Sequence, residues 1–513
     1  MSLVMERIPI LLYVYVENYQ DITLRKKFIW NLIDKIICQP YNQNRNLRSL
    51  PLIYVERNRN DMQLDMTKGK ILPILLRFTI PLMIGNVFQQ LYNMADTIIV
   101  GRYVGAGALA AVGSTGTIMF LTTGFSQGIS SGFSILVSQK YGAKDPDGVK
   151  RSVTNGIFLS ILSSVIMTAF CLAIMRPLLS LMNTPADIFD NAYAYIMVIS
   201  IGISANIFYN LFSAYLRAVG NSQVPLFFLV FSACLNVILD LLLIIKLKMG
   251  VTGAAWATDL SQLISAVLCA IYIWMRVPDL KPEPNQWKFS GAISKNQLAA
   301  GIPMAFQFAI TASGTMIMQS AINLFGSEAV ASFTAASKLQ SLVTQGMVAM
   351  GQTMATYGGQ NYGCGNIRRI KSGVWTALLT EAVYSIAVAV LMFVLLKPSL
   401  HLFFTGDVDL NAMFPWAETY CHLCTLFFVP LSTIFIFRNI MQGCGYGFLP
   451  MMGGVAELFA RLLVSMAAMK FLSYPLACFA DPAAWVAAAV FTGISYWFVI
   501  RKIERTLTSQ PAE

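Results

Sequence analysis

The sequence predicts an all-α polytopic membrane protein whose 12 transmembrane helices form two parallel six-helix repeats around a central cavity. Its composition, its long apolar segments and an internal duplication support this fold class. Of the 513 residues, 56% are hydrophobic and only 12% are charged. Soluble domains contain about 25% charged residues, so the composition argues against a soluble multidomain protein.

Twelve apolar segments follow one another between residues 71 and 500. Most contain 20 residues or more, and a hydrocarbon core about 30 Å thick requires roughly 20 apolar helical residues. We therefore expect a transmembrane helix in each of these segments: 71–98, 109–138, 152–175, 188–216, 224–246, 252–275, 298–325, 330–357, 370–396, 414–440, 448–471 and 478–500.

Four short motifs of the first half recur in the same order in the second half, at offsets between 221 and 229 residues. They begin at Ile80, Gln139, Ala218 and Gly253, and their counterparts begin at Ile302, Gln360, Gly443 and Pro482. A nearly constant offset indicates a duplication, and six spans per copy insert both copies in the same orientation. Such parallel repeats occur in transporters that rock two bundles around a central cavity. A duplicated scaffold without transport is the alternative.

The duplication divides the chain into five parts. We expect an N-lobe of six spans at 67–276, a cytoplasmic linker at 277–297 and a C-lobe of six spans at 298–500. Residues 501–513 would form a cytoplasmic tail, and 1–66 an N-terminal extension in which no apolar run is long enough to span. We interpret the extension as the result of a start codon assigned too far upstream. A true amphipathic extension is the alternative.

The distribution of basic residues predicts the orientation. From residue 62 onward, 19 Lys and Arg, with Arg217 and Arg438 among them, fall in segments that would be cytoplasmic if the N-terminus is inside. The alternate loops contain six: Arg102, Arg176, Lys246, Lys248, Lys397 and Lys470. Because cytoplasmic loops are enriched in Lys and Arg, we expect both termini in the cytoplasm. This topology explains the net charge of +11, and no nucleic-acid partner is expected.

The first span contains a polar stripe that ends in a carboxylate. Gln89, Asn93 and Asp96 lie at i, i+4 and i+7 on one helical face, and Tyr92 lies one turn before Asp96. Such a stripe must face protein or water, because lipid offers no hydrogen-bond partners. An ionised side chain in a span costs about 2.5 to 3.5 kcal/mol to insert and typically handles ions or substrate. Asp96 is therefore the first candidate functional residue.

Two further spans of the N-lobe repeat this pattern. Asn236 and Asp240 lie at i and i+4 in the fifth span, and Thr258 and Asp259 lie in the sixth. Carboxylates crowded into a medium of low dielectric constant cannot all remain ionised, so we expect the cluster to take up a proton near neutral pH. The same oxygens could instead bind Na⁺. For Asp240 and Asp259, a structural role at a helix end near water is the alternative.

The acidic cluster is confined to the first repeat. At the offsets of the duplication, Asp96 corresponds to Met318 and Asp240 to Ser465. A purely structural requirement would more naturally be kept in both copies, so the asymmetry favours a functional role. The second half has its own charges within spans, at Lys338, Glu381, Glu418, Glu457 and Arg461. Glu457 and Arg461 lie at i and i+4 and are expected to form a structural ion pair.

The sequence contains no motif typical of an ATPase or of a common intramembrane enzyme. Walker, HExxH and DDxxD-like motifs are absent, so we expect neither enzymatic activity nor a cofactor. Cys421 and Cys424 have the spacing of a metal site, but no second pair of ligands lies nearby. We interpret them as packing residues of an apolar helix.

Several motifs resemble those of the MATE (multidrug and toxic compound extrusion) efflux transporters. The motifs are Ile80–Gly85, Leu91–Gly101, Leu109–Gly113 and Leu235–Asp240, and the similarity extends from about Thr67 to Arg501. The chain looks most like the DinF-like branch of bacteria and archaea. In that branch the carboxylate that matches Asp96 is the central coupling residue. The residues that surround it match Tyr92, Asn236, Asp240 and Thr258.

The resemblance implies antiport, in which H⁺ or Na⁺ enters while amphipathic, often cationic compounds leave the cell. It also implies that the first helix bends at Pro81. If Na⁺ is the coupling ion, its ligands would be Asp96, Asn236, Asp240 and Thr258. The NorM-like branch instead has acidic residues in the seventh and tenth spans. Here the seventh span has no carboxylate, and the corresponding stretch of the tenth reads Val429-Pro430-Leu431-Ser432.

The resemblance further implies a monomer in the bacterial inner membrane, with the lipid bilayer around it and amphipathic small molecules as substrates. A flippase of lipid-linked precursors has a similar architecture and is the alternative within transport. It would require a cationic cavity, and Lys338 and Arg461 alone are too few to favour it. A non-transporting scaffold or an intramembrane enzyme is a more remote alternative.

Overall fold

The computed structural model describes residues 63–182, 184–403 and 410–508. Of the two units into which the chain divides, the described residues belong to the second, Asp61–Glu513. The prediction for the N-terminal extension therefore falls largely outside the described residues and stays a prediction. Met66, which that prediction assigned to the extension, is fully buried in the second unit.

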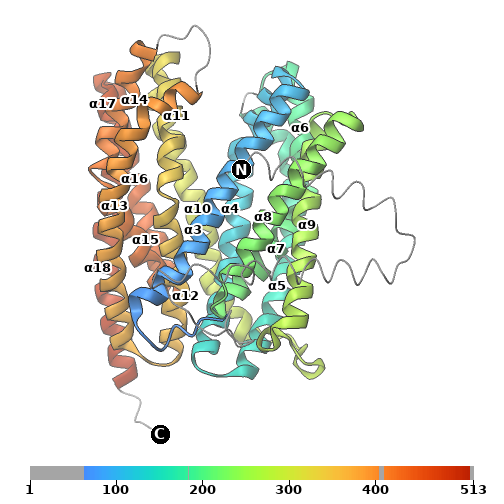
Figure 1. The fold of residues 1–513 in the computed structure, drawn as a ribbon, viewed down its shortest axis with the longest axis vertical. Helices are drawn as coiled ribbons and strands as arrows, with labels where there is room; N and C mark the ends of the chain where they lie inside the picture. Colours follow the sequence, from blue (N-terminus) through green and yellow to red (C-terminus); the bar gives the residue numbers. More distant parts are fainter. Residues whose placement is uncertain (1–62, 183, 404–409, 509–513) are drawn as a thin grey trace, which may run out of the picture. The chain divides into compact units, whose positions relative to one another are not determined.

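All regular secondary structure in the described ranges is helical (Figure 1). The helices of the N-lobe are α3 (Ile71–Tyr103), α4 (Ala106–Gly142), α5 (Pro146–Leu181), α6 (Ala186–Ile201), α7 (Ile203–Ala218), α8 (Gln223–Asp240), the π-helix η1 (Leu241–Lys246) and α9 (Val251–Arg276). The short 3₁₀ turns η2 (Pro278–Leu280) and η3 (Pro284–Gln286) follow. The helices that continue into the C-lobe are α10 (Gly291–Ile322), η4 (Asn323–Phe325), α11 (Ser327–Val343), α12 (Gln345–Gly363), α13 (Ile367–Phe403), α14 (Leu410–Thr425), α15 (Phe428–Gly443), α16 (Phe448–Phe471), α17 (Tyr474–Cys478) and α18 (Ala480–Thr508).

These helices account for the twelve predicted spans. Nine of the described helices are long and apolar enough to cross a membrane, and the two bent pairs α6–α7 and α14–α15 each add one more. The helices α11 and α12, separated by Thr344, cover the remaining predicted span, 330–357. The fold class predicted from the sequence is thus confirmed for the part of the chain that the structure describes.

Two spans are broken, which the apolar pattern alone does not reveal. The pair α6–α7 bends by 45° at Gly202, and the pair α14–α15 bends by 51°. Pro430, the third residue of α15, explains the second break, because its ring clashes with the preceding turn and it has no N–H to continue the ladder of α14. At Gly202 a Cβ atom would overlap with the carboxyl group of Asp259, so the close approach of α9 to this break requires a glycine.

The connection between the lobes is ordered and tied to α5. It contains η2 and η3, and α10 begins at Gly291, within the stretch expected to be a linker. Gln286 Nε2 donates a hydrogen bond to Asp147 Oδ1 over 2.7 Å. Lys150 Nζ lies 2.6 Å from Glu283 Oε1. These contacts fix the connection to the first turns of α5.

Most helix–helix contacts stay within one lobe. In the N-lobe, α4 packs against α5 and α7, and α8 packs against α3 and α9. In the C-lobe, α12 packs against α15, and α18 packs against α15 and α16. Figure 1 shows the corresponding blue-to-green and yellow-to-red helices as neighbours.

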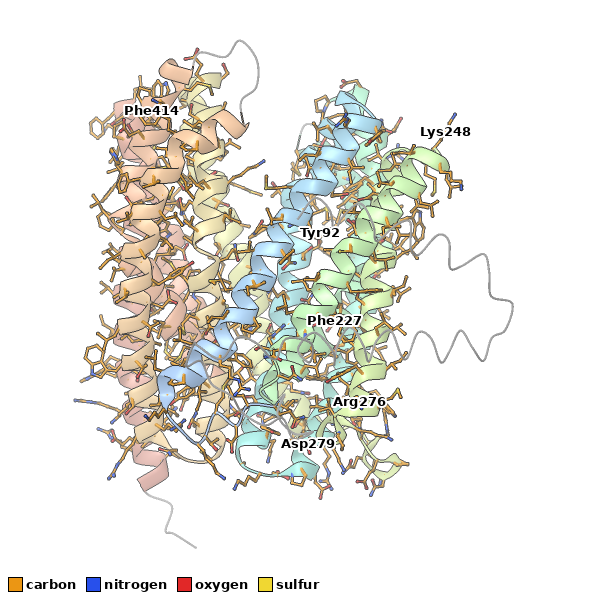
Figure 2. All side chains as sticks on the ribbon, viewed as in Figure 1. Tyr92, Phe227, Lys248, Arg276, Asp279 and Phe414 are labelled. Atoms are coloured by element: carbon orange, nitrogen blue, oxygen red, sulfur yellow. The ribbon has the colours of Figure 1, made fainter. Side chains whose placement is uncertain are left out.

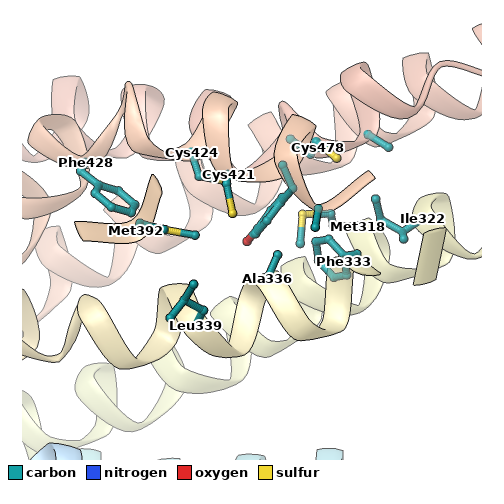
Figure 3. Packing of buried hydrophobic residues seen from close by; sticks show 14 of the residues in the cluster. Met318, Ile322, Phe333, Ala336, Leu339, Met392, Cys421, Cys424, Phe428 and Cys478 are labelled. Carbon is teal, nitrogen blue, oxygen red and sulfur yellow. The ribbon is translucent and has the colours of Figure 1, made fainter. Parts of the chain in front are cut away.

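A large apolar cluster fills the C-lobe (Figure 3). Phe333 and Leu339 of α11 pack in this cluster with Cys421 and Cys424 of α14 and with Met392 of α13. Both cysteines are buried thiols, so they lie among apolar side chains, where the sequence analysis placed them.

The two lobes approach most closely where α4 lies against α10. At Gly128 and Gly132 of α4, a Cβ atom would overlap with the backbone of α10 at Ala305 and Gly301. Small residues at a spacing of four allow two helices to approach in this way. α12 adds to the contact between the lobes, because it packs against both α3 and α4.

A pair of equivalent hydrogen bonds links the lobes at one end of α4 and α12. Gln139 Nε2 of α4 donates to the carbonyl oxygen of Gly443 over 2.9 Å. Gln360 Nε2 of α12 donates to the carbonyl oxygen of Ala218, also over 2.9 Å. Gln139 and Gln360 begin matching motifs of the duplication, as do their two acceptors. We call these two bonds the glutamine latch.

Residues 64–66, which precede α3, form hydrogen bonds to residues in and beside the glutamine latch. The backbone N–H of Met66 donates to Gln360 Oε1 over 3.0 Å, and the N–H of Leu64 donates to the carbonyl oxygen of Gly220 over 3.0 Å. Arg369 Nε donates to the carbonyl oxygen of Met66 over 3.0 Å. One short segment thus contacts both lobes.

Candidate functional site

The structure brings the predicted N-lobe site residues together. Tyr92 and Asp96 lie one turn apart on α3, and Asn236 and Asp240 lie one turn apart on α8. Thr258 comes from α9, and α8 packs between α3 and α9. Figure 2 labels Tyr92 on α3, on the side where α8 lies. Asn236 and Asp240 are fully buried.

Asn236 connects α8 to α9. With its amide oxygen turned toward α9, this side chain accepts from the Thr258 hydroxyl over 3.3 Å and from the Thr258 backbone N–H over 3.2 Å. Its amide nitrogen then donates to Asp240 Oδ2 over 3.3 Å. This orientation satisfies both ends of the amide, which is the ordinary basis for assigning it. Asn236 therefore holds the carboxyl group of Asp240 in a fixed position.

The carboxyl groups of Asp96 and Asp240 lie close together across the interface between α3 and α8, near enough to interact directly. A bond between two carboxyl groups requires a proton on one of them, because ionised carboxylates only accept. The second oxygen of each group, Oδ1, is buried and has no hydrogen-bond partner. The Tyr92 hydroxyl lies next to the side chain of Thr258. This arrangement can hold one proton between two carboxylates.

A cation could replace that proton. The unpartnered Oδ1 atoms of Asp96 and Asp240 lie in the same cluster as the oxygens of Asn236 and Thr258. Oxygen ligands of this kind suit a hard cation. In the described ranges no three His, Cys, Asp or Glu side chains are grouped as a metal site would require, so the possible Na⁺ ligands include an amide and a hydroxyl oxygen.

Tyr195 is a member of the cluster that sequence reasoning missed. It lies on α6, is 2% exposed, and interacts electrostatically with Asp96 and Asp240. The sequence carries no signal for it, because a tyrosine in an apolar helix is ordinarily a packing residue. Only the packing of α6 against α4 and α9 brings it near the carboxylates.

The alternative interpretation of Asp259 and Asp240 as water-facing residues at helix ends is wrong. Asp259 is the ninth residue of α9, is 6% exposed, and lies against Gly202 at the break between α6 and α7. Asp240 ends α8, but the π-helix η1 continues the span directly after it. A wider helical turn next to a buried carboxylate is typical of functional sites.

Pro81 lies inside α3, which is helical from Ile71 to Tyr103. It lines a small cavity of about 80 Å³ within the N-lobe, together with Tyr92 and Arg217. A proline in a helix leaves one carbonyl without its intrahelical donor and permits a bend. The predicted role of Pro81 as a hinge stays a prediction.

A second cavity, of about 460 Å³, lies between the lobes. Its volume falls within the range of small-molecule sites. Gln127, Arg217 and Gln352 line both this central cavity and the small N-lobe cavity. Tyr92 lines the small cavity and lies next to Thr258, so the carboxylate cluster adjoins the small cavity, which shares three lining residues with the central one.

The predicted ion pair of the C-lobe is confirmed and belongs to a larger network. Arg461 Nη2 lies 3.1 Å from Glu457 Oε1 on the same helix. Arg438 Nη2 lies 3.2 Å from the other oxygen of Glu457, and Arg461 Nε donates to Asp481 Oδ1 over 2.9 Å. The Tyr420 hydroxyl donates to Asp481 Oδ2 over 3.3 Å. All four charged side chains line the central cavity.

Several charges do not lie where the sequence analysis expected them. Arg217 and Arg438 were counted as cytoplasmic, but they lie inside α7 and α15 and line the central cavity. Lys338 and Glu418, which were expected within spans, are not buried: Lys338 is exposed, and the side chain of Glu418 is 41% exposed. Glu381 is buried, at 3% exposed. A position in an apolar segment does not reveal which helical face becomes buried.

The sequence matches the MatE family model over residues 81–242 and 303–467, one segment in each lobe. This chain belongs to the MatE family. Family membership confirms the resemblance to the MATE transporters found in the motifs, and it makes the chain a membrane protein of a transporter family, which is not a class of enzymes.

Relatives and solved structures agree with this assignment. The probable multidrug resistance protein YpnP of Bacillus subtilis is 30% identical over 74% of this chain and 84% of its own length. An FAD transporter of Shewanella oneidensis is 21% identical over 72% of this chain and 81% of its own length. The crystal structure of MATE in complex with MaL6 superposes with a TM-score of 0.79 at 22% identity, over 86% of this chain and 99% of the other. At this identity the superposition shows the MATE fold.

Proposed function

We propose that this MATE-family protein is a secondary active transporter that exports amphipathic organic compounds by antiport with H⁺ or Na⁺. The observation that carries the proposal is the close approach of the carboxyl groups of Asp96 and Asp240 inside the N-lobe, each with a buried and unpartnered Oδ1. A buried acidic pair of this kind binds and releases a cation, and it is costly to keep within a span without such a use.

We infer that the coupling ion is H⁺. Two carboxyl groups in contact share a proton more readily than they both ionise. Loss of the proton would leave two negative charges side by side between α3 and α8, which favours separation of these helices. The ion would thereby bias one arrangement of the N-lobe over another, which is the physical requirement for coupling.

The central cavity is the candidate substrate site. At about 460 Å³ it is large enough for a drug-sized molecule. Its lining combines aromatic side chains with amides and hydroxyls, such as Phe308, Gln307 and Thr311. Arg217 and Gln127 line this cavity and also the N-lobe cavity beside Tyr92, so a change in the N-lobe would reach the substrate. The names of relatives, among them a multidrug resistance protein and an FAD transporter, agree with organic substrates.

We further propose that the protein lies in the plasma membrane as a monomer, with both termini in the cytoplasm. Removing Arg217 and Arg438 from the predicted cytoplasmic set leaves 17 of its 19 basic residues, against six in the alternate loops. This asymmetry still follows the enrichment of Lys and Arg in cytoplasmic loops.

Transport by the purified protein in liposomes tests the proposal. A fluorescent amphipathic compound is loaded, a pH gradient or a Na⁺ gradient is imposed separately, and the rate of transport is recorded. We expect a pH gradient alone to drive transport and its collapse by a protonophore to abolish it. Transport that stops when only the Na⁺ gradient is dissipated would contradict the assignment of H⁺. Absence of transport under either gradient would contradict antiport.

A further inference from the structure

Arg217 is a cation without a counter-ion in the wall of the central cavity. It lies in the last turn of α7 and lines both the central and the N-lobe cavity. Within the described part of the chain, its guanidinium group forms neither an ion pair nor a hydrogen bond. A charge held in a protein interior of low dielectric constant without a partner is costly. It therefore calls for a ligand that supplies the missing partner.

The C-lobe wall of the same cavity presents further unused donors. Both carboxylates of this wall are engaged, because Glu457 contacts Arg438 and Arg461, and Asp481 contacts Arg461. Arg438 Nε and Arg461 Nη1, however, are buried and have no hydrogen-bond partner. The carboxylates of this wall thus have their partners, whereas the guanidinium groups retain donors.

The charged side chains that line the central cavity therefore carry a net positive charge. Three arginines, Arg217, Arg438 and Arg461, face two carboxylates, Glu457 and Asp481, which gives a sum of +1. The surplus charge is that of Arg217, since the other four residues form one connected ion-pair network.

The remaining lining of the cavity is aromatic and apolar in several places. Phe120, Phe308, Phe435 and Trp485 line it, with Leu431 and Ile434 between them. Such walls suit the apolar part of a ligand, and a planar guanidinium fork suits a carboxylate, sulfonate or phosphate group. The lining thus favours a molecule with an acidic group and a flat apolar body.

We propose that the central cavity binds amphipathic compounds that carry an acidic group, and that this group is held by Arg217. The proposal rests on the export function proposed above and names its substrate class. Arg438, on the opposite lobe, lines the same cavity and has one buried donor, Nε, without a hydrogen-bond partner. The family resemblance implied substrates that are often cationic, and the charges of this cavity favour the opposite sign.

The charge of the substrate determines how much net charge crosses the membrane in each transport cycle. Export of one monoanion against entry of one H⁺ moves two positive charges inward in each cycle. Export of one monocation against one H⁺ moves none. An inside-negative membrane potential should therefore accelerate export of an anion and leave export of a cation unchanged.

Arg217 is the residue to substitute, because its loss leaves no buried carboxylate without an ion-pair partner. Loss of Arg438 or Arg461 would leave a buried carboxylate unpaired and would destabilise the fold. Arg217→Gln removes the charge but keeps a hydrogen-bonding side chain, and Arg217→Lys keeps the charge. Arg102→Gln is the matched control, because Arg102 is exposed at the end of α3 and does not line either cavity.

Binding and transport of two probes test the proposal with the full-length protein in phosphatidylcholine liposomes. Carboxyfluorescein is the anionic probe and ethidium the cationic one. We expect Arg217→Gln to weaken carboxyfluorescein binding on the order of tenfold or more, the size of a lost charge-assisted hydrogen bond. Arg217→Lys should recover most of the affinity, and Arg102→Gln should leave it unchanged. Ethidium binding should not weaken in Arg217→Gln.

Equal carboxyfluorescein binding by Arg217→Gln and the unaltered protein, or binding of ethidium alone, would overturn the proposal. Carboxyfluorescein that binds at Arg217 but is not transported would uphold the anion site and contradict the proposed export. A further arm adds phosphatidylglycerol to the liposomes. If phosphatidylglycerol weakens carboxyfluorescein binding to the unaltered protein but not to Arg217→Gln, the site binds lipid headgroups. If phosphatidylglycerol has no effect on carboxyfluorescein binding, the site binds free anions.

Discussion

The side-chain amide of Gln360 donates a hydrogen bond to the backbone carbonyl of Ala218 over 2.9 Å, and this bond joins the C-lobe to the N-lobe. Its counterpart in the other repeat is the bond from Gln139 to Gly443, also 2.9 Å long. The two Gln-x-Tyr-Gly motifs of the duplication thus serve one structural purpose. Each supplies a donor that reaches the end of a broken span, α7 or α15, in the opposite lobe.

Loss of a hydrogen bond of the glutamine latch should allow the two lobes to separate more readily near the ends of α7 and α15. Gln360→Leu removes the bond to Ala218 and also the bond from the Met66 N–H; at about 1 kcal/mol for each hydrogen bond, it should increase the population of the open arrangement roughly fivefold or more. Cys444 lies beside the latch and is 4% exposed, so maleimide labelling of Cys444 as the only cysteine measures this opening. Gln345→Leu, on the same helix but bonded only within its own span, is the control. Unchanged labelling of Cys444 in Gln360→Leu would contradict a role for the latch.

Glycine at position 142 should be required for the approach of α4 to α12. A Cβ atom there would overlap with the carbonyl oxygen of Gln360, whereas a Cβ at Gly113 of the same helix meets nothing within 4 Å. Gly142→Ala should therefore lower the thermal unfolding temperature in detergent. Gly113→Ala should leave it unchanged or raise it slightly, since alanine favours a helix by about 1 kcal/mol over glycine. Equal unfolding temperatures for the two variants would show that α4 can shift without cost.

Residues before Met62 should be dispensable, whereas Met66 should not be. Met66 is fully buried, and Asn361 and Arg369 donate hydrogen bonds to its carbonyl oxygen. A chain that begins at Met62 keeps these contacts and should unfold and transport like the full chain. Met66→Ala should cost about 2 to 5 kcal/mol of stability, the range for a buried methionine. Loss of folding in the chain that begins at Met62 would show that the N-terminal extension is a structural element.

The two buried acidic groups of the lobes should respond differently to neutralisation. Asp240→Asn removes one of the two carboxyls that share a proton, so the pH dependence of transport should shift. Glu457→Gln leaves Arg438 and Arg461 without their shared carboxylate, and breaking such a buried pair costs about 3 to 5 kcal/mol. We therefore expect Glu457→Gln to unfold at a lower temperature while its remaining folded fraction stays coupled to the pH gradient. Normal folding with uncoupled transport in Glu457→Gln would place coupling in the C-lobe as well.

Helical spacing was sufficient to predict which polar residues of one helix share a face. The pairs Tyr92 with Asp96 and Asn236 with Asp240 follow from this periodicity, and the apolar segments located the spans that carry them. The contact between the pairs depends on how α3 packs against α8. The family resemblance suggested this contact, but spacing along the chain did not.

Several residues were misplaced or missed because their surroundings depend on contacts between distant helices. Asp481 is the second residue of α18, yet its partner Arg461 lies on α16. Arg217 and Arg438 stand near span ends in the sequence, where basic residues are ordinarily cytoplasmic, but both line the central cavity. Tyr195 resembled any other aromatic residue of an apolar helix. Periodicity and hydropathy describe one segment at a time, so they cannot reveal such contacts.

The central claim is that the proton shared by Asp96 and Asp240 couples the ion to export, and Asp96→Asn tests it most directly. The amide has nearly the same shape as the carboxyl group but cannot titrate, and Asp190→Asn, at an exposed position of α6, is the matched control. With equal amounts of folded protein in liposomes, we expect the pH gradient to accelerate export by the unaltered protein and by Asp190→Asn. Export by Asp96→Asn should show no response to the gradient. Undiminished gradient-driven export by Asp96→Asn would contradict the account.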